Sequence, residues 1–522
     1  MDAPYPFLFH HRERLVQLSK DDAYGRVLSP LLEFLNENYT DEYEEAVRMF
    51  DRGFVNARHL QKLFQPNQLV ILKTSEDLNV YALDQAPKIS KEGMSFEGWS
   101  YFYTEVCLRQ KMRRETMDVI ASEDVQISNL KVHPFSFGRK EDIEKLTHRG
   151  QAFWKMKGQH YACYTGWDHQ HDHCYNSARF MVDLATHHLM HPSNRSDIPL
   201  WNSRQKNQPW PERIKLEDEM TPEIMLLLPS TVYGFNLQDK KWVDLEVDKF
   251  HPVAWNKDAF KRLVLDEKTK EMIYALVDIQ TATKRMDDII TGKGNGLIVL
   301  LHGSPGTGKT LTAESVAEIA EKPLYRVTCG DIGTEAQDVE KYLATVLYLG
   351  KLWDCVLLLD EADVFLEERT FADLQRNSLV SVFLRVLEYY EGILILTSNR
   401  VGHFDEAFKS RIQVAIHYEN LSKKSRKAIW QNFLEMIEDS ADEDANIAEL
   451  EGHLDQLASE EMNGRQIRNA LLTARQLAKH RKERLEWEHL DQVMKTSAAF
   501  NKYLKTIRGQ SDDKLARDEG RR

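Results

Sequence analysis

Short apolar segments alternate with longer amphipathic segments from about residue 297 to residue 421. Strands that are apolar on both faces need cover on both faces, and parallel sheets obtain that cover from helices. The pattern therefore predicts an α/β domain built on a parallel sheet. The expected strands are Ile298–His302, Leu324–Cys329, Cys355–Asp360, Ile393–Ser398 and Val414–Tyr418. The expected helices begin near Lys309, Ala336 and Gln375.

The region that precedes this domain, residues 1–255, mixes helical and strand-like segments. Its helical patterns are Leu15–Asn38 and Tyr43–Phe50, and its strand-like segments include Leu69–Leu72 and Met225–Leu228. Loops that contain proline separate these segments. We expect an α+β domain here, and the sequence does not indicate what that domain does.

The region that follows has no strand pattern after Leu421 and is helical to about Tyr503. The residues from about Lys505 onward are charged and nearly free of large apolar side chains, which predicts a disordered tail. The 522 residues are enough for about three compact domains. We therefore expect an N-terminal α+β domain at 1–255, an α/β core at 256–421, an all-helical domain at 422–504 and a tail at 505–522.

The composition argues against two classes of protein. The chain has 69 basic and 82 acidic side chains and a formal net charge of −13, so no nucleic-acid partner is expected. No apolar stretch approaches the roughly 20 residues that cross a bilayer, so no transmembrane segment is expected. The N-terminus lacks the features of a secretory signal, and the five scattered cysteines are typical of reduced thiols. We expect an intracellular protein, cytoplasmic by default.

One loop has the spacing of a phosphate-binding motif and joins a predicted strand to a predicted helix. Its residues are Gly303, Ser304, Pro305, Gly306, Thr307, Gly308, Lys309 and Thr310. The glycines allow backbone N–H groups to point at phosphate oxygens, and the helix N-terminus adds positive partial charge. Lys309 is expected to bind the β- and γ-phosphates of ATP, and the Thr310 hydroxyl is expected to bind Mg²⁺.

Two later strands end in polar residues that suit the same chemistry. Asp360 and Glu361 follow a buried strand; Asp360 is expected to hold Mg²⁺ and Glu361 to polarise the water that attacks the γ-phosphorus. Asn399 follows the next strand and is expected to orient that water or touch the γ-phosphate. Arg411 follows soon after, and arginine neutralises charge on phosphoryl oxygens well.

With these motifs in this order, residues from about Trp255 to Tyr503 resemble the AAA+ ATPases. In more detail the chain resembles fungal AAA-family ATPases that have a large N-terminal domain of unknown function, on phrases such as Asp360–Leu366 and Thr397–Arg400. The resemblance implies a P-loop NTPase core with Walker A and Walker B motifs, followed by a helical lid. It also implies ATP hydrolysis with Mg²⁺ and an oligomeric ring, with six subunits as the expectation.

The resemblance assigns roles to further residues. Asn399 corresponds to the first sensor, and Arg411 to an arginine finger that reaches the nucleotide of a neighbouring subunit. Arg465 is aligned with the second sensor, and Arg468 is the competing choice. Relatives that thread polypeptides have an aromatic residue after the second strand. In this chain the corresponding stretch, Gly330–Thr334, contains no aromatic residue and is followed directly by a helix. Many relatives also have two arginines near the finger, where this chain has Lys409.

Two functions remain open on these residues. The first is a ring-forming ATPase that remodels a protein or other macromolecular client selected by residues 1–255. The second is a nucleotide-gated adaptor or scaffold with slow hydrolysis. Unwinding of nucleic acid is disfavoured because no basic groove is evident. The histidines near Cys174 lack the usual spacing of zinc ligands and are interpreted as a polar surface loop.

Overall fold

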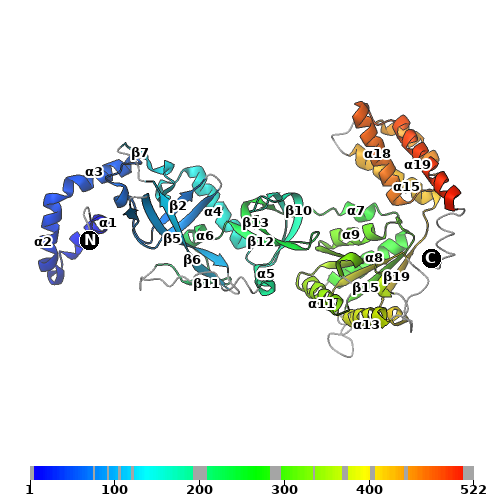
Figure 1. Cartoon of the computed structure of the whole chain (residues 1–522), viewed down its shortest axis with the longest axis horizontal. Coiled ribbons are helices and arrows are strands. Elements are labelled where there is room, and N and C mark those ends of the chain that lie inside the picture. The colour runs from blue at the N-terminus through cyan, green and yellow to red at the C-terminus, as the bar shows by residue number, and fades with distance from the viewer. Residues whose placement is uncertain are drawn as a thin grey trace. The chain divides into compact units, whose positions relative to one another are not determined.

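The structure is a computed structural model of the chain. It describes residues 5–74, 77–90, 93–103, 107–118, 123–191, 209–281, 296–332, 336–366, 374–388, 390–399, 406–439 and 445–508. The contacts divide the chain into two compact units, Met1–Val253 and Ala254–Arg522. Figure 1 labels many of the elements of both, and each unit is described by itself.

The first unit begins with three helices, α1 (Pro6–Leu18), α2 (Asp22–Asn38) and α3 (Thr40–Asp51). The sequence predicts one helix over Leu15–Asn38, and the structure divides it. Asp21 is the reason, because its side chain accepts a hydrogen bond from the Ala23 N–H at 3.0 Å and so starts a new helix. The pattern Tyr43–Phe50 lies inside α3.

The rest of the first unit is built on antiparallel sheets. The seven-stranded sheet has the order β11-β6-β5-β3-β2-β8, with β4 paired to β5, and the five-stranded sheet has the order β13-β12-β10-β9-β14. The strands of the larger sheet are β2 (Leu69–Lys73), β3 (Leu78–Leu83), β4 (Lys88–Ser90), β5 (Gly93–Tyr103), β6 (Cys107–Met117), β8 (Val132–Pro134) and β11 (Arg213–Lys215). Those of the smaller sheet are β9 (His160–Trp167), β10 (Cys174–Val182), β12 (Thr231–Asn236), β13 (Lys241–Glu246) and β14 (Phe250–His251).

Short elements complete this unit. They are the paired strands β1 (Phe54–Val55) and β7 (Val125–Gln126), the helices α4 (Lys140–Lys155), α5 (Leu184–Met190) and α6 (Pro222–Leu226), and 3-10 turns at Leu60–Leu63, Ile127–Asn129, Phe135–Phe137 and Val247–Lys249. The unit is therefore α+β, as the sequence predicts.

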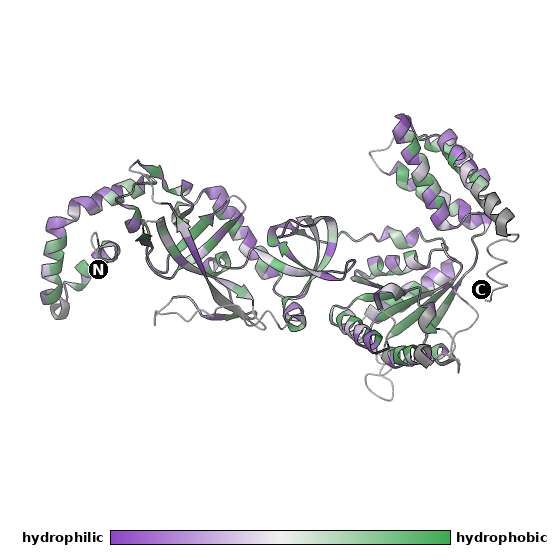
Figure 2. Cartoon of the chain, in the orientation of Figure 1, coloured by the Kyte–Doolittle hydropathy of each residue, from purple (hydrophilic) through white to green (hydrophobic). Residues whose placement is uncertain are grey.

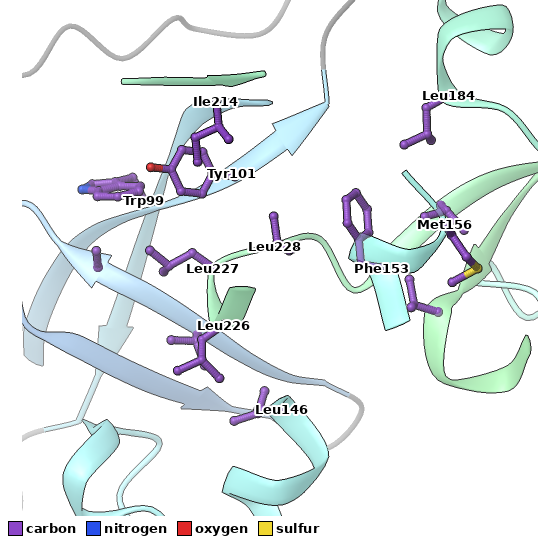
Figure 3. Packing of buried hydrophobic residues seen from close by; sticks show 14 of the residues in the cluster. Trp99, Tyr101, Leu146, Phe153, Met156, Leu184, Ile214, Leu226, Leu227 and Leu228 are labelled. Carbon is purple, nitrogen blue, oxygen red and sulfur yellow. The ribbon is translucent and has the colours of Figure 1, made fainter. Parts of the chain in front are cut away.

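The segment Met225–Leu228 is not a strand, and that prediction is wrong. Thr221 caps helix α6 by accepting a hydrogen bond from the Ile224 N–H, so the segment begins as a helix and ends in a turn. Leu226, Leu227 and Leu228 are apolar because they are buried beside Trp99, Tyr101 and Leu146 in the core of this unit, as Figure 3 shows. A run of four apolar residues is too short to distinguish a strand from a buried helix end.

The second unit contains a five-stranded parallel sheet with the order β16-β17-β18-β15-β19. Its strands are β15 (Leu297–Gly303), β16 (Leu324–Thr328), β17 (Val356–Asp360), β18 (Ile393–Ser398) and β19 (Val414–Tyr418). These are the five predicted strands to within a residue or two at each end, so the parallel α/β core is confirmed. Figure 2 shows that the strands of this sheet are mostly hydrophobic, and β17 and β18 are buried along their whole length, as strands between two helical layers must be.

Helices cover both faces of this sheet (Figure 1). Residues of α7 (Asp258–Lys261), α8 (Glu267–Thr281) and α9 (Lys309–Ala320) share one buried cluster with alternate residues of the strands, such as Val299 and Leu301. On the other face, Gly350 of α11 (Ala336–Leu352) lies against Leu357, and α13 (Leu374–Glu388) packs on α11. The short helices α10 (Cys329–Ile332), α12 (Asp363–Leu366) and α14 (Glu406–Lys409) lie in the connections.

A helical subdomain follows the sheet and has its own core around Trp430. Its helices are α15 (Lys423–Glu438), α16 (Ile447–Gly452), α17 (Leu454–Leu457), α18 (Gly464–Arg481) and α19 (Trp487–Arg508). Helix α19 continues past residue 505, where the sequence predicts a disordered tail, and residues 509–522 lie outside the described residues. Within the described ranges, no helix combines the length and the apolar character needed to span a membrane.

Candidate nucleotide-binding site

The glycine-rich loop joins β15 to α9 through a backbone that favours glycine. Gly303, Gly306 and Gly308 have φ angles of 140°, 74° and 106°, which residues with a Cβ rarely adopt. A Cβ at Gly303 would also lie 2.2 Å from the carbonyl oxygen of Tyr418 on β19. The loop can therefore keep this path against the sheet only with glycine at these positions.

Lys309 lies inside this loop at the start of α9. Its side chain is 6% exposed, and its ammonium donates to the carbonyl oxygens of Gly303 at 2.9 Å and Ser304 at 2.8 Å. The Thr307 hydroxyl also donates to the Ser304 carbonyl, at 2.7 Å. A buried positive charge thus stands beside the backbone N–H groups at the helix N-terminus, which is an arrangement that attracts anions.

The imidazole of His302 is affected by the positive charge of Lys309. His302 immediately precedes the loop, and burial, the neighbouring His417 and the Lys309 ammonium together lower its pKa below the ordinary value. The two imidazole Nδ1 atoms are 3.3 Å apart. His302 therefore adds no charge at neutral pH to that of Lys309.

Asp360 lies at the end of β17 next to the first residues of α9. The Thr310 hydroxyl donates to its Oδ1 at 3.1 Å, and the Thr397 hydroxyl donates to the same oxygen at 2.5 Å. The Arg326 guanidinium donates to Oδ2 at 2.5 Å. A hydroxyl and a carboxylate are the protein ligands that P-loop NTPases supply to Mg²⁺ beside the nucleotide phosphates. Thr310 and Asp360 therefore fit an Mg²⁺ ion.

Glu361 follows Asp360 with a strained backbone. Its φ is 57°, a conformation that costs a residue other than glycine on the order of 1 kcal/mol. The strain is held by Thr397, because the Glu361 N–H donates to the Thr397 hydroxyl at 2.9 Å and the Ala362 N–H donates to the Thr397 carbonyl at 2.8 Å. The Glu361 residue is exposed beside the buried Asp360. The turn therefore separates two adjacent carboxylates into different environments.

Asn399 follows β18, the strand that lies between β17 and β15. It is half-buried, and its backbone N–H donates to Asp363 Oδ1 at 3.1 Å. The Ser398 hydroxyl donates to the same carboxylate oxygen. Because the carboxyl ends of adjacent parallel strands meet at one edge of a sheet, Asn399, Asp360 and the glycine-rich loop share that edge.

Arg411 is placed differently. Its guanidinium donates to the Ala407 carbonyl at 2.8 Å and to Glu388 Oε2 at 3.4 Å. These contacts hold it against α13 and α14 of its own chain. They do not involve the glycine-rich loop, so the structure does not join Arg411 to the site formed by Lys309 and Asp360.

The helical subdomain contacts the loop at the start of α18. The Gly464 N–H donates to the Gly306 carbonyl at 2.8 Å, and a Cβ on Gly306 would lie 2.6 Å from the side chain of Asn463. Asn463 caps α18 in a reciprocal pair of hydrogen bonds with Gln466. The first turn of this helix therefore rests directly on the glycine-rich loop.

The two candidate arginines on α18, Arg465 and Arg468, are both exposed. Arg468 lies one turn after Gly464 and so shares its helix face. Burial raises the pKa of the Glu314 carboxyl on α9, and the charges of Arg326 and Arg468 act in the opposite direction. The charge of Arg468 thus acts on Glu314 of α9.

Sequence reasoning missed Arg326, Thr397 and Gly464 as parts of this site. Each acts through a contact with a residue far away in the chain, so no local motif indicates it. The histidines near Cys174 are exposed in the turn between β9 and β10. Among the residues that the structure describes, no group of three or more His, Cys, Asp or Glu side chains is placed to hold a metal ion.

Comparison with known proteins covers the second unit. Residues 299–420 match the ATPase family associated with various cellular activities (AAA), and residues 421–511 match the fungal AAA+ ATPase lid domain. The helical subdomain is referred to as the lid from here on.

Three curated relatives match part of the chain. The human ATPase family AAA domain-containing protein 3B is 30% identical over 166 residues, which are 29% of this chain and 24% of that protein. The Drosophila melanogaster homolog of protein 3A is 31% identical over 173 residues, or 31% of this chain and 27% of the relative. The ATPase family AAA domain-containing protein 3 of Xenopus tropicalis is 28% identical over 190 residues, which are 32% of this chain and 30% of that protein. The chain spans less than a third of the length of these relatives.

Proposed function

We propose that this chain, whose residues 299–511 are an AAA+ ATPase domain with its lid, binds ATP with Mg²⁺ and hydrolyses the β–γ phosphoanhydride bond. The observation that supports this most strongly is the hydrogen bond of 3.1 Å between Thr310 and Asp360. It joins the glycine-rich loop to the acidic strand end, so the groups for phosphate and for Mg²⁺ meet at one place.

Each residue then has a defined task. The loop N–H groups and the Lys309 ammonium bind the phosphates, and Thr310 with Asp360 holds Mg²⁺. When bound, Mg²⁺ neutralises part of the charge on the β- and γ-phosphates. Glu361 accepts a hydrogen bond from the attacking water and directs it at the γ-phosphorus, and Asn399 at the neighbouring strand end orients that water. The exposed Glu361 residue beside the buried Asp360 suits this division of work.

Phosphate release from ATP by the purified chain tests this proposal. Lys309→Ala should abolish ATP binding. Glu361→Gln should bind ATP normally and hydrolyse it about 10² to 10⁴ times more slowly, the usual contribution of a general base. Glu451→Gln, an exposed substitution in the lid, is the matched control. Full activity in the Glu361→Gln variant would remove Glu361 from its proposed role.

We further propose that the subunits form a ring, six in number, in which Arg411 acts on the nucleotide of the adjacent subunit. The support is its position, because Arg411 is held at α13 and α14 rather than at its own loop. Mixing Arg411→Ala with Lys309→Ala subunits should restore turnover, since some interfaces then combine an intact loop with an intact finger. Light scattering must show that both variants assemble, and mixtures that assemble without recovery would contradict action in trans.

The same proposal assigns the regions of the chain. Residues 1–255 select a protein or other macromolecular client, 256–421 form the ATPase core, and the lid begins at 422 and includes α19 to Arg508. The expected compartment is the cytoplasm. Turnover that a candidate client stimulates would favour a remodeller, whereas partner binding that follows the nucleotide state without appreciable turnover would favour an adaptor. In the stretch Gly330–Thr334, which lacks the aromatic residue of relatives that thread polypeptides, residues 333 and 334 lie outside the described residues.

A further inference from the structure

Arg326 makes the closest contact of any basic side chain with Asp360 in the described part of the site. It lies on β16, the strand next to β17, and its guanidinium is 2.5 Å from Asp360 Oδ2. The Arg326 side chain is 48% exposed and that of Asp360 is 7% exposed. The ion pair is therefore open to solvent on the arginine side, where it is screened and easily exchanged.

Asp360 does not need Arg326 to keep its orientation. Its Oδ1 already accepts hydrogen bonds from the hydroxyls of Thr310 and Thr397, which come from two different elements. Two donors on one oxygen fix the plane and direction of the carboxylate. What Arg326 adds is a positive charge on Oδ2, next to the ligand that is proposed for Mg²⁺.

A second carboxylate is available to the same arginine. Glu314 on α9 is half-buried and interacts electrostatically with Arg326, Asp360 and Arg468. The charge of Arg326 thus acts on two acidic side chains, on Asp360 through an ion pair and on Glu314 through space. A divalent cation on Asp360 would repel the guanidinium, and Glu314 would attract it.

We propose that the Arg326 guanidinium competes with Mg²⁺ for Asp360 and moves to Glu314 when Mg²⁺ and ATP bind. This inference rests on the proposed function, because it concerns the same metal position. Arg326 would then weaken Mg²⁺ binding in every nucleotide state and set the Mg²⁺ concentration at which the site fills. Glu314 would oppose that effect by stabilising Arg326 away from Asp360.

The test measures metal binding rather than turnover. Mn²⁺ is titrated into the chain in the presence of an ATP analogue with a β–γ bond that cannot be hydrolysed, and free Mn²⁺ is read by electron paramagnetic resonance. Arg326→Gln should bind Mn²⁺ about two- to fivefold more tightly, the scale of a half-exposed ion pair. Arg326→Lys, which keeps the charge, should stay close to the unmodified chain. Glu314→Gln should bind Mn²⁺ more weakly.

Arg385→Gln is the matched control, because Arg385 forms an exposed ion pair with Glu340 between α13 and α11. Unchanged or weaker Mn²⁺ binding by Arg326→Gln would overturn the inference. So would a loss of ATP affinity by this variant in the presence of a chelator, since Arg326 would then bind phosphate directly. An unmodified chain that binds no ATP at all would instead overturn the proposed function, so the two failures are distinguishable.

Discussion

Gly464 donates its backbone N–H to the carbonyl oxygen of Gly306 at 2.8 Å, and this bond joins the first residue of the lid helix α18 to the middle of the glycine-rich loop. The two residues are 158 positions apart in the chain. Movement of the lid therefore acts on the phosphate-binding loop without any intermediate side chain.

The first prediction concerns this bond. Proline fits the first position of a helix, and Asn463, with φ −87° and ψ 169°, already has the conformation that precedes proline. Gly464→Pro should therefore keep α18 but remove the donor to Gly306 and press the ring against its carbonyl. We expect ATP to bind about five- to tenfold more weakly, as for a lost hydrogen bond of roughly 1 kcal/mol with some steric cost. Fluorescent ATP titration measures this.

Gly464→Ala is the control for that substitution, since it keeps the N–H group. Its Cβ would lie 3.1 Å from the Gly306 carbonyl oxygen, so only a small adjustment is needed. Circular dichroism should show unchanged helix content in both variants. Equal ATP affinity in the proline and alanine variants would mean that the bond does not influence the loop.

The second prediction concerns Thr397, which is 2% exposed. Thr397→Val removes a donor to the buried Asp360 and the acceptor of the Glu361 N–H, at a cost of about 1 to 3 kcal/mol. Since Glu361 is the proposed base, turnover should fall at least about tenfold while ATP affinity changes less. Thr397→Ser keeps the hydroxyl and should retain most of the activity. A valine variant with the turnover of the serine variant would contradict the role given to this hydroxyl.

The third prediction is a pH dependence in the first unit. His187 is buried, with its ring stacked 4.0 Å from that of Tyr233, and burial followed by the neighbouring His191 and His188 lowers its pKa from 6.5 to about 4. Below pH 6.5 the unfolded chain takes up a proton that the folded chain refuses. The stability from this site is therefore complete above pH 6.5 and is lost progressively as pH falls toward 4, by up to about 3 kcal/mol.

Hydrogen exchange of β12 and β13, corrected for intrinsic rates, measures this loss of protection. His187→Phe keeps a stacked ring without a titratable group, so its protection should depend less on pH than that of the unmodified chain. Parallel loss of protection in both proteins between pH 6.5 and pH 4.5 would assign the effect to other groups.

The fourth prediction concerns cysteine reactivity. Cys355 immediately precedes β17 and is 2% exposed, and burial raises the pKa of its thiol well above the ordinary value. Cys174 is exposed. At pH 7.5 a maleimide should label Cys174 rapidly and Cys355 only after unfolding, because the thiolate is the reactive species. Peptide mapping by mass spectrometry compares the two, and equal labelling of the native protein would show that β17 opens readily.

The sheet and the glycine-rich loop could be predicted from the sequence because their signals are local. β15, β17 and β18 are continuous runs of large apolar residues, and the Gly303–Thr310 motif fixes which strand precedes the phosphate helix. The same logic failed at Met225–Leu228, where burial among Trp99 and Leu146 required apolar residues but did not require a strand.

The rest of the site depends on contacts that no local pattern encodes. The pairing of Arg326 with Asp360 spans 34 positions and follows from β16 lying next to β17, a strand order that the sequence alone does not determine. The choice between Arg465 and Arg468 likewise depends on which face of α18 meets the glycine-rich loop. Such relationships become visible only when the register and the packing are known.

The strand that leads into the glycine-rich loop is hydrogen-bonded on both sides, to β18 and to β19. A pulling force that the lid applies at Gly306 would therefore act on β15. The backbone hydrogen bonds to β18 and to β19 must both break before β15 can slide. A margin strand such as β16 could peel away one bond at a time. The lid therefore contacts the loop of a strand that is held by two ladders rather than one.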